Sequence, residues 1–186
     1  MPLAALFIGV AAVAISSPGY FRGVLTGEAG HANRCGEGSW QYKYAMIVRD
    51  VQPADLSAVA VLLGQLGYEL DEQEVRGRLD RVRKASDHSV RVAVVDGKIV
   101  GLLHVFERPA LEKPCEAVVQ SLVVDAGLRG NGVGAALMQE AEAWARDRGL
   151  ASVVLYTRTD RDAARAFYER IGYGLSATSH FMRRDL

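Results

Sequence analysis

The sequence predicts an α/β domain with a mixed sheet, antiparallel strands first and a parallel pair later, and helices on both faces. Three observations favour this class. Apolar residues alternate on both sides of an Asp-Gly pair at 96–97, as in a hairpin. Four other segments carry apolar residues at helical spacing. A glycine-rich turn at 129–134 joins a strand to a helix, which is the connection that parallel strands require.

Before the hairpin, the domain is predicted to contain one strand and two helices. Residues 45–51 read as a short strand. Apolar residues recur at helical spacing from Leu56 to Leu66, and Gly67 ends that helix. Asp71 and Glu74 resemble a capping box, which predicts the start of a second helix.

After the hairpin strands, around 90–94 and 99–106, the predicted elements are a loop, a strand, a helix, a strand, a helix and a last strand. Their residues are, in that order, 108–114, 117–124, 133–149, 151–157, 160–170 and 178–184. The strand–helix–strand crossover makes 117–124 and 151–157 a parallel pair with right-handed connection.

Residues 1–44 differ in composition from the rest of the chain. Residues 1–15 are almost all apolar without a basic start, and Ser-Ser-Pro-Gly at 16–19 ends the run before membrane-spanning length. Residues 27–39 are rich in glycine and polar side chains and lack periodicity. We predict that 1–44 is a poorly ordered extension or unused start and that 45–186 is the folded domain; a weak signal or anchor, or an integral element, are the alternatives.

Composition limits the possible partners. Lys plus Arg and Asp plus Glu both number 22, so no net charge points to nucleic acid or a membrane surface. Without a secretory or membrane signal, a cytoplasmic location is expected. The cysteines (Cys35 and Cys115) and the four scattered histidines match no metal-ligand spacing, so no metal site is expected.

The glycine turn is the strongest functional signal. It places unpaired backbone N–H groups and the positive end of a helix dipole where an anion can bind. Gly130-x-Gly132-x-x-Ala135 also fits a dinucleotide fingerprint, but too little chain follows for the remaining strands of that fold. No Gly-Lys-Ser/Thr occurs, which excludes a Walker loop. The sequence therefore predicts a phosphate site, with a merely tight turn as the alternative.

These residues resemble the GNAT superfamily of acetyl-CoA-dependent N-acetyltransferases. The family signature Gln/Arg-x-x-Gly-x-Gly/Ala matches 129–134, the preceding Leu-Val-Val matches the family's hydrophobic strand, and 164–173 is similar to its Ala-x-x-Phe-Tyr-Glu-x-x-Gly-Phe motif. The resemblance covers about residues 46–186. It implies a GNAT-like sheet with a central, splayed parallel pair and an N-acetyltransferase domain over 45–186.

The resemblance also implies residue roles. Strand residues would pair with the pantetheine arm of acetyl-CoA, and the turn would hold its pyrophosphate, with Arg129 bracing the loop or touching a phosphate. The implied cosubstrate residues are Leu122, Val123, Val124, Arg129, Gly130, Asn131, Gly132, Val133, Gly134 and Ala135. Tyr168 occupies the position of the family's general acid, and a phenol suits protonation of a thiolate; a packed aromatic beside Phe167 is the alternative.

Two positions depart from the family pattern. Many relatives carry a glutamate on the strand before the turn, where this chain has Gln120 and its neighbours. Glu116, His104 or water remain as candidates for the general base. Arg161 replaces a common asparagine, so either this arginine contacts a phosphate or the flanking aspartates cap the helix.

The leading hypothesis is transfer of acetyl from acetyl-CoA to a primary amine of a small molecule or peptide, by direct attack in a ternary complex. The alternative is a non-catalytic acyl-CoA-binding or regulatory module on the same fold, which the missing carboxylate favours. The acceptor cannot be identified from these residues. A homodimer is possible, because sheet-edge dimers are common in the family.

Overall fold

The computed structural model describes residues 45–186, and the predictions for 1–44, which include Cys35, lie outside the described residues. The elements in chain order are β1 (Met46–Asp50), η1 (Pro53–Asp55), α1 (Leu56–Leu66), α2 (Glu72–Arg83), β2 (His88–Val95), β3 (Lys98–Arg108), β4 (Glu116–Val124), η2 (Ala126–Leu128), α3 (Val133–Asp147), β5 (Val153–Leu155) and α4 (Asp162–Arg170).

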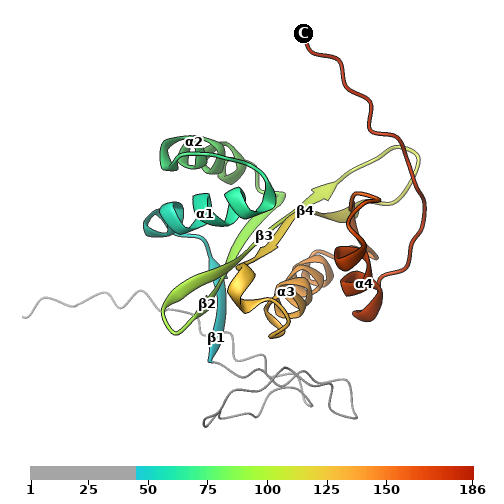
Figure 1. Cartoon of the computed structure of the whole chain (residues 1–186). Helices are drawn as coiled ribbons and strands as arrows, with labels where there is room; N and C mark the ends of the chain where they lie inside the picture. Colours follow the sequence, from blue (N-terminus) through green and yellow to red (C-terminus); the bar gives the residue numbers. More distant parts are fainter. Residues whose placement is uncertain (1–44) are drawn as a thin grey trace, which may run out of the picture.

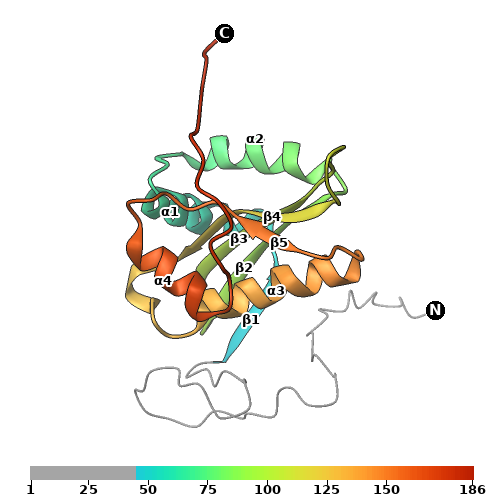
Figure 2. The same ribbon diagram turned by 90° about the vertical axis from the view of Figure 1, so that its right-hand side faces the viewer.

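The strands form one mixed sheet in the order β1-β2-β3-β4-β5 (Figure 1). Each of the first four strands is antiparallel to its neighbours among them, and β5 runs parallel to β4. The α1 and α2 helices cover one face and α3 covers the other (Figure 2). The predicted α/β class, with antiparallel strands before a parallel pair, is therefore confirmed.

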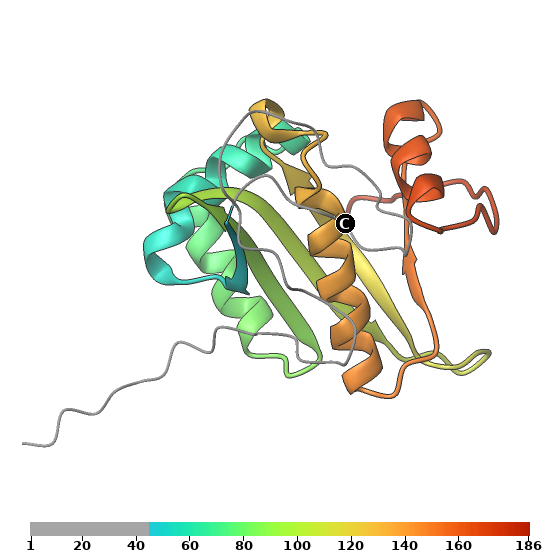
Figure 3. The same cartoon turned by 90° about the horizontal axis from the view of Figure 1, so that it is seen from below.

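The core has two clusters, one on each face of the sheet. Under α3, the fully buried Leu137, Met138 and Ala141 pack on Leu103 and Ala117. Figure 3 shows α3 lying over the strands on this side. The other cluster joins α1 and α2 to the sheet through Leu56, Val59, Leu62, Val75, Val92 and Leu102. Burial of these apolar side chains is the main stabilising contribution to both layers.

Gly101 on β3 sets how closely α3 approaches the sheet. A Cβ atom at this position would lie 2.8 Å from Leu137 Cδ1 and 3.2 Å from Val133 Cγ1. Such distances are shorter than van der Waals contact, so a larger residue would require the Leu137 and Val133 side chains, or the helix that carries them, to shift. The first turn of α3 is thereby held directly over β3.

The helix starts and ends follow the predicted signals in α1 and α2. The Asp71 carboxylate accepts a hydrogen bond from the Glu74 N–H at 2.7 Å, and Glu74 accepts one from the Asp71 N–H at 3.1 Å. Gly67 ends α1 with φ of 103°, a left-handed conformation that favours glycine. Among residues 45–186, no helix is long and apolar enough to cross a membrane.

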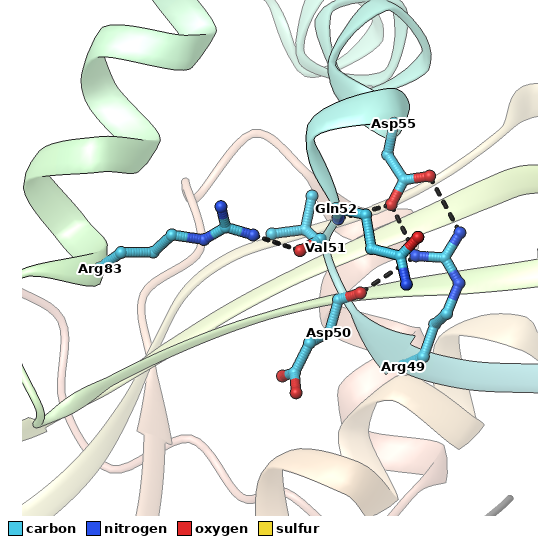
Figure 4. Close-up of polar contacts among 6 residues, drawn as sticks. All are labelled: Arg49, Asp50, Val51, Gln52, Asp55 and Arg83. Carbon is cyan, nitrogen blue, oxygen red and sulfur yellow. Dashed lines mark hydrogen bonds and ion pairs between the residues drawn. The ribbon is translucent and has the colours of Figure 1, made fainter. Parts of the chain in front are cut away.

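A bidentate ion pair fixes the connection from β1 to α1 (Figure 4). Arg49 donates to both carboxylate oxygens of Asp55, at 2.6 and 2.9 Å, and Asp55 is only 6% exposed. The same carboxylate accepts from the Gln52 N–H at 2.7 Å. Arg83, at the end of α2, donates to the Val51 carbonyl. These contacts hold α1 and α2 at the sheet edge.

Two predictions for the C-terminal part are corrected. The strand predicted at 151–157 is only Val153–Leu155, and no strand forms at 178–184. Phe181 and Met182 are adjacent, so they would face opposite sides of a strand and neither side would be wholly apolar; they are 90% and 85% exposed. Among the described residues β5 is therefore an edge strand, and the parallel pair lies at one side of the sheet.

Candidate active site

The glycine turn adopts the geometry of an anion site. Gly130 and Gly132 have φ of 80° and 83°, and Gly132 is the N-cap of α3. The first backbone hydrogen bond of the helix runs from the Ala136 N–H to the Gly132 carbonyl at 3.0 Å. The N–H groups of Val133, Gly134 and Ala135 therefore have no acceptor within the helix and lie at the positive end of its dipole.

The polar side chains of the turn brace it internally. Arg129 Nε donates to the Val124 carbonyl at 3.2 Å. Asn131 Nδ2 donates to the carbonyls of Leu128 and Arg129, at 3.3 and 3.4 Å. These bonds tie the loop to the end of β4, so the backbone N–H groups are held in place before any ligand binds.

The strand that leads into this turn has a free edge. β4 pairs with β5 only through Ala117, Val118 and Val119. The β3–β4 register shifts between His104 and Val105, and beyond that bulge β4 continues beside β3 alone among the described strands. Apart from the Val124 carbonyl, which accepts from Arg129, the far edge of the segment 121–124, which contains Leu122, Val123 and Val124, is thus available for backbone pairing with an extended ligand.

Tyr168 is positioned by packing between α4 and α3. Gly134 has no side chain, and a Cβ atom there would lie 3.1 Å from Phe167 Cζ, so α4 approaches the first turn of α3 closely. The Tyr168 ring lies 5.0 Å from Phe167 and 6.2 Å from Tyr173, between ring centroids. Tyr168 packs against the core cluster under α3. No described residue hydrogen-bonds to its hydroxyl, which is left for a ligand.

The environment keeps the Tyr168 phenol protonated. Burial raises the pKa of Tyr168 above its usual value, and the positive charge of Arg161 opposes this only in part. A neutral phenol donates a proton but is a poor base. Both sequence interpretations of this residue, packed aromatic and proton donor, are compatible with this geometry.

The two side chains predicted as candidate bases differ sharply in their surroundings. Glu116 accepts from Lys113 Nζ at 2.6 Å and from Arg108 Nη2 at 2.8 Å. These bonds lower the pKa of Glu116, Lys113 having the larger effect, and leave little driving force to take up a proton. His104 instead contacts another imidazole, His88, with 2.9 Å between His88 Nδ1 and His104 Nε2.

The sequence does not show the histidine pair, because His88 and His104 are 16 residues apart and belong to different strands. His88 lies opposite Phe106 and His104 lies opposite Val90 in the β2–β3 register. The two histidines are therefore diagonal neighbours on one face of a hairpin. Counting outward from the Asp96-Gly97 turn would have placed them on opposite faces, because the register shifts by one residue between Ala93 and Val94. In the described part of the chain no group of three or more His, Cys, Asp or Glu is arranged to hold a metal.

Of the two interpretations left open at the start of α4, capping by the flanking aspartates is wrong. Asp160 binds Arg158 through two bonds, at 2.9 and 2.5 Å, and Asp162 is the first helical residue. The N-cap is Arg161, which makes no side-chain capping bond and reaches the Leu66 carbonyl at 3.5 Å. Arg161 thus lies between α4 and the end of α1.

A sequence profile of the acetyltransferase (GNAT) family matches residues 57–173, which contain the sheet from β2 to β5, the glycine turn and Tyr168. The chain belongs to this family. The N-acetyltransferase fold expected from the two sequence motifs is thereby confirmed.

Individual relatives agree with this family. Glucosamine 6-phosphate N-acetyltransferase of Trypanosoma brucei brucei is 30% identical over 149 residues, which are 75% of this chain and 95% of that protein. Uncharacterized protein YxbD of Bacillus subtilis (strain 168) is 36% identical over 81 residues, 43% of this chain and 46% of that protein. The structure of aminoglycoside N-acetyltransferase AAC(6')-Iy in complex with CoA has a TM-score of 0.70 at 16% identity, covering 77% of this chain and 97% of that one; this likeness shows the fold.

Proposed function

We propose that this GNAT acetyltransferase transfers the acetyl group of acetyl-CoA to a primary amine of a small acceptor, by direct attack in a ternary complex. The observation that carries the proposal is the free edge of β4, which is joined through η2 and the glycine turn to the unpaired N–H groups of α3. An extended arm ending in a pyrophosphate fits this combination, because it needs both a strand-like partner and an anion site.

The donor would be held mainly by backbone groups. Leu122, Val123 and Val124 would pair with the amide groups of the pantetheine arm. The pyrophosphate would accept hydrogen bonds from the turn and the first turn of α3, that is, from residues 130 to 135, with Arg129 keeping the loop in shape. The complex of a similarly folded aminoglycoside acetyltransferase with CoA supports this choice of donor.

Tyr168 would act as the general acid. When the amine nitrogen bonds to the thioester carbonyl carbon, the carbon–sulfur bond breaks and its electron pair goes to sulfur. The thiolate then takes the phenolic proton of Tyr168, and solvent returns a proton to the phenolate. The raised pKa of Tyr168 keeps this proton in place until the thiolate forms.

The acceptor is proposed by class only. Since a relative that aligns over 75% of this chain is named glucosamine 6-phosphate N-acetyltransferase, that amino sugar is the first acceptor to try. Aminoglycosides, polyamines and peptide N-termini complete the panel. A homodimer and a cytoplasmic location remain predictions.

A specific observation favours a second candidate, a non-catalytic acyl-CoA-binding module. β4 carries Gln120 and Ser121 where many relatives have a glutamate, and the nearby carboxylate of Glu116 is engaged by Lys113 and Arg108. A module of this kind would bind acetyl-CoA and release no thiol with any amine.

The test combines calorimetry with acetyl-CoA and thiol release across the acceptor panel. We expect binding and turnover, and we expect Tyr168→Phe to lower kcat about 100-fold or more with little change in the Kd for acetyl-CoA. Tyr173→Phe is the matched control, because its hydroxyl only bonds Glu142 at 3.0 Å. Binding without turnover would favour the module, and no binding would refute both.

A further inference from the structure

His88 and His104 form a hydrogen-bonded pair on the middle strands of the sheet. His88 Nδ1 lies 2.9 Å from His104 Nε2, and Phe106 stacks on the His88 ring with 5.1 Å between centroids. No described residue bonds to His104 Nδ1. One nitrogen of the inner imidazole is therefore engaged and the other is left for a ligand.

The pair lies one strand away from the free edge of β4. His104 is opposite Ser121, at the bulge that follows the last residue paired with β5, Val119. Neighbouring strands are about 4.8 Å apart, so an imidazole on β3 reaches a group bound over residue 121. This is the end of the free edge that lies farthest from the phosphate-binding turn.

His104 and Tyr168 are on opposite faces of the sheet. Leu103 and Val105 belong to the core cluster under α3, so His104, between them, projects to the face of α1 and α2. Tyr168 packs with the cluster under α3. A proton acceptor and a proton donor thus flank the free edge from its two sides.

We propose that His104 removes the proton of the acceptor amine and passes it through His88 to solvent, on the face of the sheet opposite Tyr168. The proposal rests on the proposed acetyl transfer. It makes His104 a catalytic residue and His88 a positioning and relay residue. It also supplies the base that β4 itself lacks.

The proton transfers balance with one arrangement of hydrogens. His104 carries its proton on Nε2 and accepts the amine proton at Nδ1 as the nitrogen–carbon bond forms. The Nε2 proton moves to His88 Nδ1, and His88 releases a proton from Nε2. The products are the amide and the free thiol, whose hydrogen comes from Tyr168; solvent gains one proton and returns one. Each imidazole is then left with its proton on Nδ1, and exchange of these protons with solvent after product release restores the starting tautomers.

An exit for the proton exists beside His88. A hollow of about 510 Å³ lies where β1 ends and is lined by His88, Ser89, Arg83, Arg91 and Arg148, among others. Each arginine has a partner. Arg83 donates to the Val51 carbonyl, Arg91 pairs with Asp50 and Glu140, and Arg148 pairs with Glu107. Asp87 Oδ1 lies 3.9 Å from His88 Nε2. The carboxylate of Asp87 favours arrival of the proton at His88, and the surrounding guanidinium groups favour its release.

The electrostatics keep the inner imidazole ready to accept. Burial, and secondarily the neighbouring His88, lower the pKa of His104 to about 4. His104 is therefore neutral across the physiological range, with its lone pair available. A relay to a second imidazole compensates for the weak basicity, because the proton does not have to remain on the buried ring.

The kinetic test compares His104→Asn and His88→Asn with His180→Asn, a histidine on the exposed C-terminal segment, using glucosamine 6-phosphate and the rest of the panel as probes. We expect His104→Asn to lower kcat about 100-fold and His88→Asn about 10-fold, with the Kd for CoA changed less than about twofold. In His88→Asn one cause of the low pKa of His104 is removed, so the acid limb of kcat/KM moves to higher pH. If the histidine pair had only a structural role, the acid limb of kcat/KM would stay in place.

The second test needs no turnover. Imidazole ¹⁵N NMR of the free protein at neutral pH should show His104 uncharged, with its proton on Nε2. A proton on Nδ1, a charged His104, or His104→Asn retaining half of kcat would overturn the relay while CoA binding persists. Failure of the native protein to bind CoA would instead refute the proposed function.

Discussion

On the face under α3, β4 presents only apolar side chains, Ala117, Val119, Leu122 and Val124, all in or against one cluster. On the opposite face the same strand presents Glu116, Val118, Ser121 and Val123, of which Val118 and Val123 are buried and Val123 belongs to the second core cluster. Beyond α1 and α2 that face becomes polar, with the histidine pair and the Arg108–Glu116 ion pair. The two sides of one strand are therefore built for different tasks.

Because the two sides of β4 differ, the two proposed substrates can be bound by different sets of residues. The donor side is an apolar layer in which α3 carries the glycine turn and α4 carries Tyr168. The acceptor side leaves strand-borne polar groups uncovered by helices, as a variable acceptor pocket requires. Variants on each face should therefore affect different steps.

The largest expected effect is on the stability of the two cores. Leu137→Ala removes a fully buried side chain of α3. Leu62→Ala removes a side chain of α1 that is 2% exposed. We expect losses of about 4 and about 3 kcal/mol in the free energy of unfolding, because the cluster under α3 is larger and less able to close a cavity. Denaturant unfolding measures both.

The same two variants should differ in their effect on CoA binding. Leu137→Ala should also raise the Kd for CoA, since α3 carries the glycine turn, while Leu62→Ala should leave it unchanged. Leu111→Ala, at a fully exposed loop position, is the control. Equal weakening of CoA binding by both core variants would contradict the division between the faces.

A smaller effect is expected at the anchor of α1. Asp55→Asn removes the bidentate partner of Arg49, and we expect a loss of about 2 kcal/mol at neutral pH. The hydrogen bond from Arg49 holds the pKa of Asp55 below its usual value. This stabilisation is therefore present above the unfolded pKa of about 3.9 and disappears as the pH falls through the lower folded value.

Urea unfolding of Asp55→Asn and the native protein between about pH 7 and pH 3 should show the two stabilities converging in acid. Asp50→Asn makes the same charge change at a side chain that is 79% exposed and, in Figure 4, points away from the Arg49–Asp55 pair. That control should change stability by less than about 0.5 kcal/mol. A constant difference between Asp55→Asn and the native protein at all pH values would argue against the ion pair.

The donor face was predictable from the sequence because its signals are local. The glycine turn, the strand before it and the Phe-Tyr pair are contiguous motifs, and the fold they predicted is the one observed. The acceptor face is assembled from residues on different strands, and His88 and His104 meet only through the hairpin register. The strand predicted at 178–184 does not form, because its side chains supply no apolar face to bury.

The smallest expected effect on stability is at Gly134, where the donor face can be perturbed without damaging the fold. Gly134→Ala places a methyl group 3.1 Å from Phe167 Cζ, so Phe167, and with it Tyr168, must shift by a few tenths of an ångström. The gain in helix propensity, about 1 kcal/mol, offsets the strain and leaves the free energy of unfolding nearly unchanged. We expect kcat to fall about fivefold to tenfold, because a proton donor displaced from the sulfur loses efficiency.

Gly77→Ala is the control: it lies in α2 with no atom within 4 Å of the added Cβ, and it should raise stability by about 1 kcal/mol and leave kcat unchanged. If Gly134→Ala kept full kcat, the position of Tyr168 would not limit the reaction, and proton transfer on the opposite face would become the step to examine.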